Sequence, residues 1–295
     1  MSISIFNIQI IYTYHHQARR MKNKNIMSVD LEDFFCDLPF ESWSKYESRV
    51  LKNTNKILDL FEKYQIKATF FTLGYIAEKF PDLIKKIDDK GHEIASHSYS
   101  HLDIRKTTEK DFENDIVKSI KILEEIIGKK VLGFRAPYFS IDKKSFWAMK
   151  ILSKYFKYDS SIFPVKTPLY GIRNAPRNIY KPNLTNPSIE DVESELIEIP
   201  LATDRIPIIG NIPIAGGFHL RFLPYFYIKY GLNKINKNNN SFIFYIHPKD
   251  LDPEMPKINE YAWHYYYNLS GATKKFEKIL KDFEFCSVKD FLKLV

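Results

Sequence analysis

The chain has 295 residues, of which 44% are hydrophobic and 27% are charged, with 44 Lys and Arg against 36 Asp and Glu. This length and hydrophobic fraction can fill a sizeable core, which excludes a disordered tail and indicates one large globular domain or two smaller ones. The formal net charge of +8 comes from scattered lysines, a pattern that disfavours nucleic acid as a partner and stays compatible with an anionic glycan or an anionic membrane face.

The pattern of residues 1–25 indicates a leader segment that lies outside the folded domain. The segment is apolar, but Asn7 and Gln9 interrupt it. Its basic pair follows the apolar stretch, which is the reverse of the order in a secretory signal. Met21 and Met27 offer alternative starts, so we expect that the leader is not part of the natural protein.

The two cysteines, Cys36 and Cys286, lie far apart and outside any CxxC pattern. They predict neither a disulfide framework nor a cysteine zinc site, and they fit a reducing compartment. No stretch approaches the roughly 18 consecutive apolar residues of a membrane-spanning helix. We therefore expect a soluble protein of the cytoplasm, able to make transient contact with the inner face of the membrane.

Strand and helix patterns alternate from the first buried run onward. Runs typical of buried strands occupy residues 25–35, 67–76, 92–98, 131–137 and 158–164. Segments with helical spacing occupy residues 49–66, 81–91, 107–130 and 145–155. Thr107 or Thr108 is expected to cap the start of the third helix, and Gly128 its end. This alternation predicts an α/β fold with parallel strands covered by helices.

The regular pattern is interrupted and then returns. Residues 164–220 read as Pro- and Gly-rich loops with a short strand at 196–200. After them come the apolar strand 241–248, an aromatic helix at 263–269, a helix at 272–283 and a final strand and helix at 283–295. Because no repeat or low-complexity linker divides the chain, we expect residues 26–295 to form a single domain.

Reactive side chains follow several of the predicted strands. They are Asp30, Glu32 and Asp33 after the first, His97 and His101 after the third, Arg135 after the next, and His247 after the strand 241–248. In parallel α/β folds, ligands gather at these carboxyl ends. Two imidazoles and one carboxylate can hold a divalent metal and leave positions open for water and substrate. A metal held in this way lowers the pKa of water and polarises a carbonyl group.

The carboxylates of the first strand can divide two roles between them. Strand alternation places Asp30 and Glu32 on the same side, which suits one proton-accepting base and one metal ligand. The HxxxH spacing of His97 and His101 is a weak metal signal alone, and the acidic strand end strengthens it.

Four segments in this order, SVDLED, HSYSH, GFRAPYF and FYIHP, resemble the motif set of the polysaccharide deacetylases (NodB homology, carbohydrate esterase family four). The later segments YDSSIFP, GGFHLRFLPY and IHPKDLDPEMP are similar to the subfamily found beside exosortase-type exopolysaccharide loci. The resemblance covers residues 26–295.

This resemblance implies a distorted (β/α) barrel with fewer than eight repeats. It also implies a hydrolase that removes N-acetyl groups from an amino sugar in a bacterial polysaccharide or glycan precursor. The implied cofactor is one divalent metal ion, with zinc favoured over cobalt, iron or nickel. The implied partner is an acetylated glycan or glycan-lipid, and not nucleic acid.

The resemblance also assigns roles to individual residues. Asp30 matches the catalytic base, His97 and His101 match metal ligands, and Arg135 matches the arginine that orients the base. Tyr138 matches the residue whose backbone N–H helps to bind the oxyanion.

His247 matches the general acid, with Ile246 as its apolar neighbour. The sequence departs from the commonest family motif, in which two aspartates are adjacent, because here Leu31 separates Asp30 from Glu32 and Asp33. Either Glu32 or Asp33 can therefore be the third ligand, and strand geometry favours Glu32.

The acid histidine also lacks an assigned carboxylate partner, for which Asp159 and Asp204 are candidates. We expect Pro137, Phe218, Arg221, Tyr225 and Ile246 to contact the substrate. Two rival functions remain: a non-catalytic glycan-binding protein on the same barrel, and an esterase or amidase that acts on a non-sugar acetylated substrate. A complete set of base, ligands and acid argues against the first of these.

Overall fold

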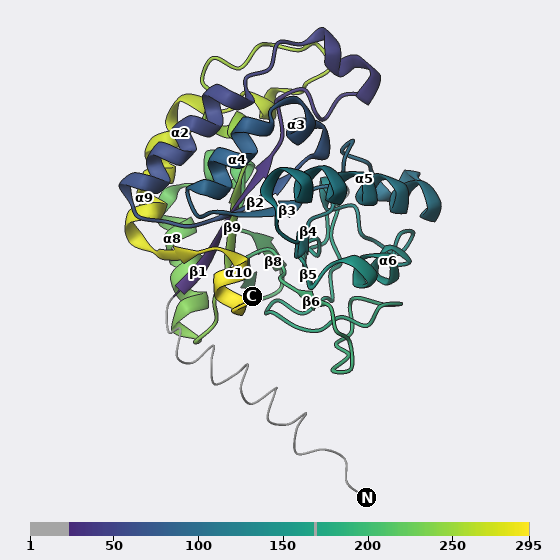
Figure 1. Ribbon diagram of the computed structural model, residues 1–295. Coiled ribbons are helices and arrows are strands. Elements are labelled where there is room, and N and C mark those ends of the chain that lie inside the picture. The colour runs from purple at the N-terminus through teal and green to yellow at the C-terminus, as the bar shows by residue number, and fades with distance from the viewer. Residues whose placement is uncertain (1–23, 168–169, 295) are drawn as a thin grey trace, which may run out of the picture.

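The computed structural model describes residues 24–167 and 170–294 (Figure 1). Eight parallel strands form its main sheet: β1 (Lys24–Leu31), β2 (Thr69–Thr72), β3 (Glu93–Ser96), β4 (Gly133–Phe134), β5 (Tyr158–Asp159), β6 (Ile197–Glu198), β9 (Ile243–Ile246) and β10 (Glu284–Cys286). Neighbouring strands pair in sequence order from β1 to β6. The predicted parallel α/β sheet is therefore confirmed.

The sheet curls into a barrel around β1. This strand pairs with β10 near its start and with β2 near its end, while β9 pairs along its opposite edge. An isolated parallel bridge between Leu201 and Ile243 joins the β6 side to β9 and closes the ring. The architecture is the distorted (β/α) barrel that was expected.

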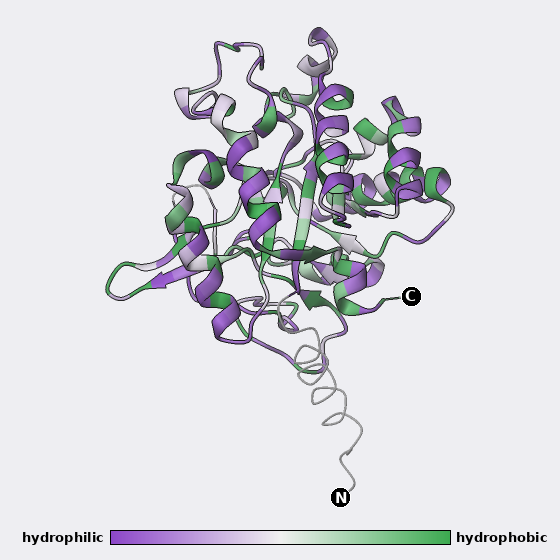
Figure 2. Cartoon of the chain, turned by 90° about the vertical axis from the view of Figure 1, so that its left-hand side faces the viewer, coloured by the Kyte–Doolittle hydropathy of each residue, from purple (hydrophilic) through white to green (hydrophobic). Residues whose placement is uncertain are grey.

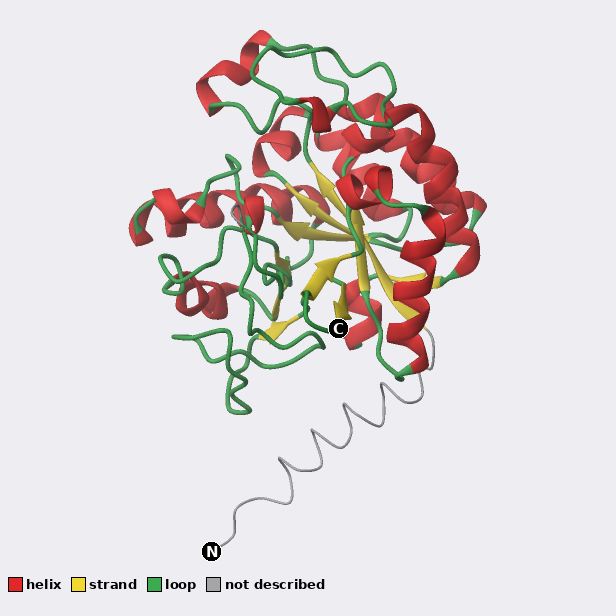
Figure 3. Ribbon diagram, turned by 180° about the vertical axis from the view of Figure 1, so that it is seen from behind, coloured by secondary structure: helices red, strands yellow, loops and turns green. Residues whose placement is uncertain are grey.

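Helices surround the barrel (Figures 1 and 3): α2 (Val50–Lys63), α3 (Gly74–Lys79), α4 (Pro81–Asp89), α5 (Glu109–Ile127), α6 (Ala148–Tyr155), α7 (Gly217–Phe222), α8 (Tyr225–Lys237), α9 (Leu269–Asp282) and α10 (Val288–Leu292). Figure 2 shows hydrophilic residues alternating with hydrophobic ones along these helices. Helix α2 buries Ile57, Leu58 and Phe61, as its spacing predicted. Not one of the helices within 24–167 and 170–294 is long and apolar enough to cross a bilayer.

The predicted cap of the longest helix is confirmed. The Thr108 side chain accepts a hydrogen bond from the Asp111 N–H, and Gly128 ends α5 with a φ of 66°. Because that φ lies in the left-handed region, glycine suits the position better than any other residue.

Several predicted elements differ in extent from the structure, among them the strands predicted for 131–137 and 158–164, which are limited to Gly133–Phe134 and Tyr158–Asp159. The strand predicted for 67–76 ends at Thr72, because α3 begins at Gly74, which lies so close to α5 that an added Cβ would fall 3.1 Å from the Ser119 Cα. The aromatic segment 263–269 forms only the 3-10 turn η5 (Trp263–Tyr265), and α9 already begins at Leu269.

The segment between β6 and β9 contains more structure than the sequence indicated. A hairpin of β7 (Thr203–Ile206) and β8 (Gly210–Pro213) precedes α7 and α8. Helix α8 escaped prediction because aromatic residues, Asn and Gly231 weaken its helical signal. Packing compensates, since Gly231 allows the helix to approach Ile214 closely.

The domain begins slightly earlier than residue 26. Strand β1 starts at Lys24, and the buried Asn25 is paired with Phe285 of β10. The rest of the predicted leader, residues 1–23, lies outside the described residues. At the opposite end of the barrel, the segments that follow β1 and β9 meet at one rim, where the Tyr261 hydroxyl donates to the Phe34 carbonyl over 2.6 Å.

Candidate active site

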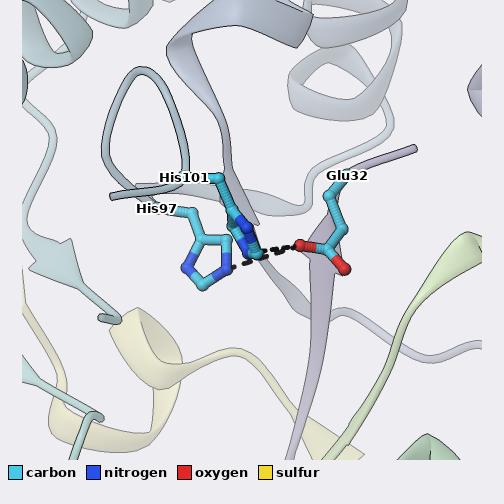
Figure 4. Close-up of side chains that lie close together, drawn as sticks. All are labelled: Glu32, His97 and His101. Carbon is cyan, nitrogen blue, oxygen red and sulfur yellow. Dashed lines mark ion pairs between the residues drawn. The ribbon is translucent and has the colours of Figure 1, made fainter. Parts of the chain in front are cut away.

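Glu32, His97 and His101 converge at the rim formed by the carboxyl ends of β1 and β3 (Figure 4). Glu32 Oε2 lies 2.7 Å from His101 Nε2 and 3.9 Å from His97 Nε2. All three side chains are buried, and their ligand atoms lie within 4.8 Å of one another. This is the geometry of two imidazoles and one carboxylate aimed at a common point.

The loop that carries both histidines is held by α5. The Asp115 carboxylate accepts hydrogen bonds from the backbone N–H groups of Tyr99 and Ser100, at 2.7 and 3.1 Å. Ser98 and His101 adopt positive φ angles of 67° and 57°. The loop is therefore fixed in a conformation that costs backbone strain, as is common at functional sites.

The donor atoms fit a divalent metal such as zinc. His97 Nδ1 lies 2.8 Å from the Arg135 carbonyl oxygen, to which it donates, so Nε2 keeps a free electron pair. Burial lowers the pKa of His97 to about 4, which keeps the imidazole neutral. The buried Glu32 Oε2 has no hydrogen bond of normal geometry within the described residues. Its electron pairs are thus free for a cation.

Asp33, the other candidate ligand, is not part of this cluster. Its carboxylate contacts the Ser48 hydroxyl and accepts from the backbone N–H groups of Arg49 and Val50, at 3.0 and 3.2 Å. Asp33 thus caps the first turn of α2, where N–H groups lack helical partners. This corrects the alternative that Asp33 is a metal ligand, because its carboxylate is bound to the start of α2 and lies outside the cluster of Glu32, His97 and His101.

Asp30 lies beside the metal-ligand cluster and is held by Arg135. Arg135 Nη1 donates to Asp30 Oδ1 over 2.6 Å and to the Ser28 hydroxyl over 3.0 Å. The other two donor nitrogens of the guanidinium bond to Ser160. Because Arg135 is fully buried and committed to these partners, it holds Asp30 through Oδ1 and leaves Oδ2 without a bond from the guanidinium.

His247 faces the same point from the end of β9. Its Nε2 lies 3.8 Å from Asp30 Oδ2 and 3.8 Å from Glu32 Oε1. Its Nδ1 lies 2.8 Å from Asp250 Oδ2. Burial would lower the pKa of His247, but the charges of Asp250 and Glu32 outweigh it and raise this pKa. His247 therefore tends to carry a proton on the nitrogen that faces the cavity.

The carboxylate partner of His247 is Asp250, and neither of the two candidates from the sequence, Asp159 and Asp204, has this role. Asp159 lies on β5 beside Glu198, and Asp204 pairs with Lys234 over 2.8 Å. Asp250 was missed because its contact with His247 arises in a 3-10 turn, η4 (Pro248–Leu251). The signal was present in the sequence as a capping residue three positions after His247.

The pair of Asp159 and Glu198 is buried in the barrel. These residues are direct partners across β5 and β6, and both are fully shielded from solvent. Burial raises the pKa of Asp159 to about 6. Burial and the neighbouring charge of Asp159 raise the pKa of Glu198 well above its usual value. Burial of the pair therefore favours the protonated form of these carboxyl groups over the ionised form.

Lys249 is a second residue that sequence reasoning missed. Its Nζ donates to Glu32 Oε1 and to Asp37 Oδ2, at 2.7 Å each. Burial opposes the charged form of this lysine, but Asp37 and Glu32 raise its pKa well above the usual value. Because 217 positions separate Lys249 from Glu32, no local pattern reveals the contact.

One cavity of about 570 Å³ is lined by Asp30, Glu32, His97, His101, His247, Lys249 and Asp250. Tyr138 contributes to its wall, with its ring centroid 4.4 Å from that of His101. Tyr138 has a φ of 56° in the turn η3 (Pro137–Phe139), whose first N–H groups have no intrahelical partner. Pro137 is buried at the start of this turn and lies outside the residues that line the cavity.

Of the residues expected to contact the substrate, some line the cavity and others do not. Phe218 and Arg221 line the cavity, although Arg221 also bonds to the protein through several donors. Ile246 is buried in the core of β9. Tyr225 lies away from the cavity, because its hydroxyl bonds to the Lys278 carbonyl and contacts Asp282 on α9. This corrects the prediction of a substrate contact for Tyr225.

Two families match successive parts of the chain. Residues 42–154 match the polysaccharide deacetylase family, and residues 160–293 match a family described as a domain of unknown function (DUF3473). The first range contains His97, His101 and Arg135, and the second contains His247. The site thus combines both matched ranges with β1, which precedes them.

Curated relatives match over shorter lengths. A peptidoglycan deacetylase of Helicobacter pylori is 32% identical over 152 residues, which cover 49% of this chain and 51% of that protein. A peptidoglycan-N-acetylglucosamine deacetylase of Bacillus cereus is 43% identical over 88 residues, or 30% of this chain and 32% of that protein. The chain therefore matches about half or less of the length of these relatives.

Solved structures share the fold over nearly the whole chain. One from Mycobacterium smegmatis, classed with the polysaccharide deacetylases, has a TM-score of 0.61 at 16% identity and covers 92% of this chain and 90% of its own. An allantoinase has a TM-score of 0.57 at 16% identity, with coverage of 91% and 88%. Because such folds host different activities, this likeness concerns architecture alone.

Proposed function

Because this chain carries a polysaccharide deacetylase domain, we propose that the protein hydrolyses the acetamide group of an N-acetylated amino sugar. The products are acetate and a free amino sugar. The observation that carries this proposal is the convergence of a Glu/His/His cluster, a fixed carboxylate and a histidine in one cavity.

Glu32, His97 and His101 would hold the metal ion, for which we propose zinc. A divalent ion bound there supplies Lewis acidity that activates water and polarises the acetyl carbonyl. Glu32 suits this role because opposing charges lower its pKa: burial would raise it, but Lys249, His101 and His247 outweigh burial. The carboxylate thus stays ionised at neutral pH.

The protein's own side chains move the protons. Asp30 takes the proton from the attacking water through Oδ2, while Arg135 holds Oδ1. His247 gives a proton to the departing nitrogen, and Asp250 keeps the imidazole oriented and charged. The backbone N–H of Tyr138 donates to the oxygen on which negative charge develops. An amine leaves poorly without a proton, which makes the His247 step essential.

We propose a bacterial glycan that contains N-acetylglucosamine-type units as the substrate, either as a polymer or as a lipid-linked precursor. The similarity to peptidoglycan deacetylases of Bacillus cereus and Helicobacter pylori supports this class. We further propose a location in the cytoplasm or at the inner face of the membrane, which suits the two free, buried cysteines.

The test is acetate release from defined substrates. Zinc-loaded protein would be incubated with N-acetylglucosamine oligomers and peptidoglycan fragments, and acetate would be quantified. The Asp30→Asn variant, which keeps the metal ligands, serves as the matched control and should release at least about a hundred-fold less. Binding of glycans without acetate release would indicate a glycan-binding protein, and acetate from aryl esters alone would indicate an esterase.

A further inference from the structure

Four aromatic rings form a partly exposed surface beside the cavity. We call this surface, made of Phe218, Phe222, Trp263 and Tyr267, the aromatic platform. The exposed fractions of Phe222, Trp263 and Tyr267 are 48%, 65% and 42%. Phe218 stacks on Phe222 with ring centroids 5.5 Å apart. Tyr267 lies 5.8 Å from Phe222 and 5.8 Å from Trp263, so the rings form a continuous set.

The aromatic platform is continuous with the proposed active site. Phe218 and Trp263 line the same cavity as Asp30 and His247. Phe222 and Tyr267 extend the surface outward from that cavity. A ligand that fills the cavity and continues beyond it would therefore lie against these rings.

A buried arginine holds the aromatic platform in place. Arg221 Nη1 donates to the carbonyl oxygens of His264, Tyr265 and Tyr267, at 3.0, 3.1 and 2.9 Å. These bonds tie the segment around η5 to α7, which carries Phe218 and Phe222. The rings are thus fixed relative to each other before any ligand binds. Preorganised rings lose little conformational entropy on binding.

The same arginine couples the aromatic platform to the general acid. Arg221 Nε donates to Asp250 Oδ1 over 3.1 Å, and Asp250 Oδ2 in turn holds His247 Nδ1. One buried side chain therefore positions both the platform and the partner of His247. This arrangement suits a substrate that touches both at once.

The chemistry of exposed aromatic rings favours a sugar as the occupant. The C–H groups on one face of a pyranose carry partial positive charge, and they pack against the negative face of an aromatic ring. Other exposed aromatics, such as Phe226 and Tyr230 on α8, lie outside the residues that line the cavity. Continuity with the cavity thus distinguishes the aromatic platform from scattered surface rings.

We propose that the aromatic platform is a subsite for a sugar unit adjacent to the one that is deacetylated. The substrate is then an oligosaccharide or polymer, and not a monosaccharide. This proposal rests on the proposed deacetylase function, but it concerns binding and is tested separately from turnover.

The first measurement is binding, followed by tryptophan fluorescence. The chain has three tryptophans, of which Trp43 is buried and Trp263 is 65% exposed. N-acetylglucosamine oligomers of one to six units should protect Trp263 from iodide quenching, with affinity rising with length. Trp263→Ala should weaken binding of the tetramer about ten-fold, measured calorimetrically. Trp263→Phe, which keeps a ring, should restore part of the affinity.

The second measurement is chain-length dependence of turnover. In the wild type, kcat/KM should be higher for the tetramer than for the dimer. Trp263→Ala and Phe222→Ala should each reduce the ratio of the tetramer value to the dimer value. Phe226→Ala is the matched control, because it removes an exposed ring outside the cavity and should leave the ratio unchanged. Circular dichroism and melting temperature confirm that each variant folds.

The outcomes separate the two proposals. Binding that depends on Trp263 without acetate release would sink the deacetylase function and support the subsite. Acetate release with unchanged length dependence and affinity in Trp263→Ala would overturn the subsite. Binding of anionic lipid vesicles that depends on Trp263, with no effect on oligosaccharides, would also overturn it, in favour of a membrane contact.

Discussion

Lys249 holds one oxygen of Glu32, while the other oxygen of that carboxylate faces the two histidines. Lys249 Nζ lies 2.7 Å from Glu32 Oε1, and His101 Nε2 lies 2.7 Å from Glu32 Oε2. The ammonium therefore orients Glu32 to offer a single oxygen to a metal. It also places a positive charge next to a cation site, which weakens the attraction of that site for metal.

We predict that Lys249→Met binds zinc more tightly than the wild type. A like charge close to a cation opposes binding by on the order of 3 kcal/mol at an effective dielectric constant of about 20. The freed Glu32 side chain costs at most about 2 kcal/mol in lost orientation, so the electrostatic effect prevails. Calorimetric titration measures the change, with Lys249→Arg as the charge-conserving control. Weaker zinc binding in Lys249→Met would contradict this balance.

Substitutions of Glu32 and Asp33, the two carboxylates after β1, should have different effects on zinc binding and on stability. Glu32→Gln should lower zinc affinity by more than about a hundred-fold, because it removes a charged ligand. Asp33→Ala should keep zinc affinity and lower the free energy of unfolding by about 1–2 kcal/mol, because it removes the cap of α2. Bound zinc and urea unfolding are measured on both variants. A loss of zinc in Asp33→Ala would return Asp33 to the ligand set.

Asp250→Asn should shift the pH profile of the proposed deacetylase activity. Asp250 raises the pKa of His247, so its neutral replacement lets that pKa fall. In the proposed mechanism the protonated form of His247 acts as the acid, so the limb on which kcat declines with rising pH should move about one unit or more toward acid. The acidic limb should move less. An unmoved basic limb would show that Asp250 does not set the charge of His247.

Glu198→Gln should make the protein more stable at alkaline pH relative to the wild type. The raised pKa values of Asp159 and Glu198 mean that the folded state binds more protons than the unfolded state. Wild-type stability therefore falls as pH rises from the unfolded pKa, near 4, through about 6 and beyond. The amide of the Glu198→Gln variant cannot ionise, so its advantage in melting temperature should grow between about pH 5 and pH 8. Glu195→Gln, at an exposed position, is the control and should show no such trend.

The sequence could predict what depends on short-range patterns. Buried runs and their ends located Asp30, His97 and His247 at one rim, because parallel strands bring their carboxyl ends together. Contacts between residues that are far apart in the sequence could not be predicted in this way. Lys249 meets Glu32 over 217 positions, and composition gives no hint of it.

Two other predictions, those for Asp33 and for the segment that forms α8, failed because contacts with other parts of the fold decide the outcome. Asp33 carries a carboxylate as Glu32 does, but the start of α2 needs an acceptor for its free N–H groups, and Asp33 supplies it. Helix α8 has weak intrinsic propensity and forms because tertiary packing stabilises it. In both cases, the deciding partner lies in a separate part of the fold.

The pairing of β1 sets an order of events during protein synthesis. This strand leaves the ribosome first among the described strands, yet its partners β9 and β10 begin at residues 243 and 284. Until those residues emerge, the edge of β1 opposite β2 has no neighbour, and His247 has not been made. A nascent chain that ends before β9 therefore lacks both the strand that covers this edge of β1 and the histidine that faces Asp30 and Glu32. The rim that carries the proposed active site is completed only when β9 docks and brings His247 to Asp30 and Glu32.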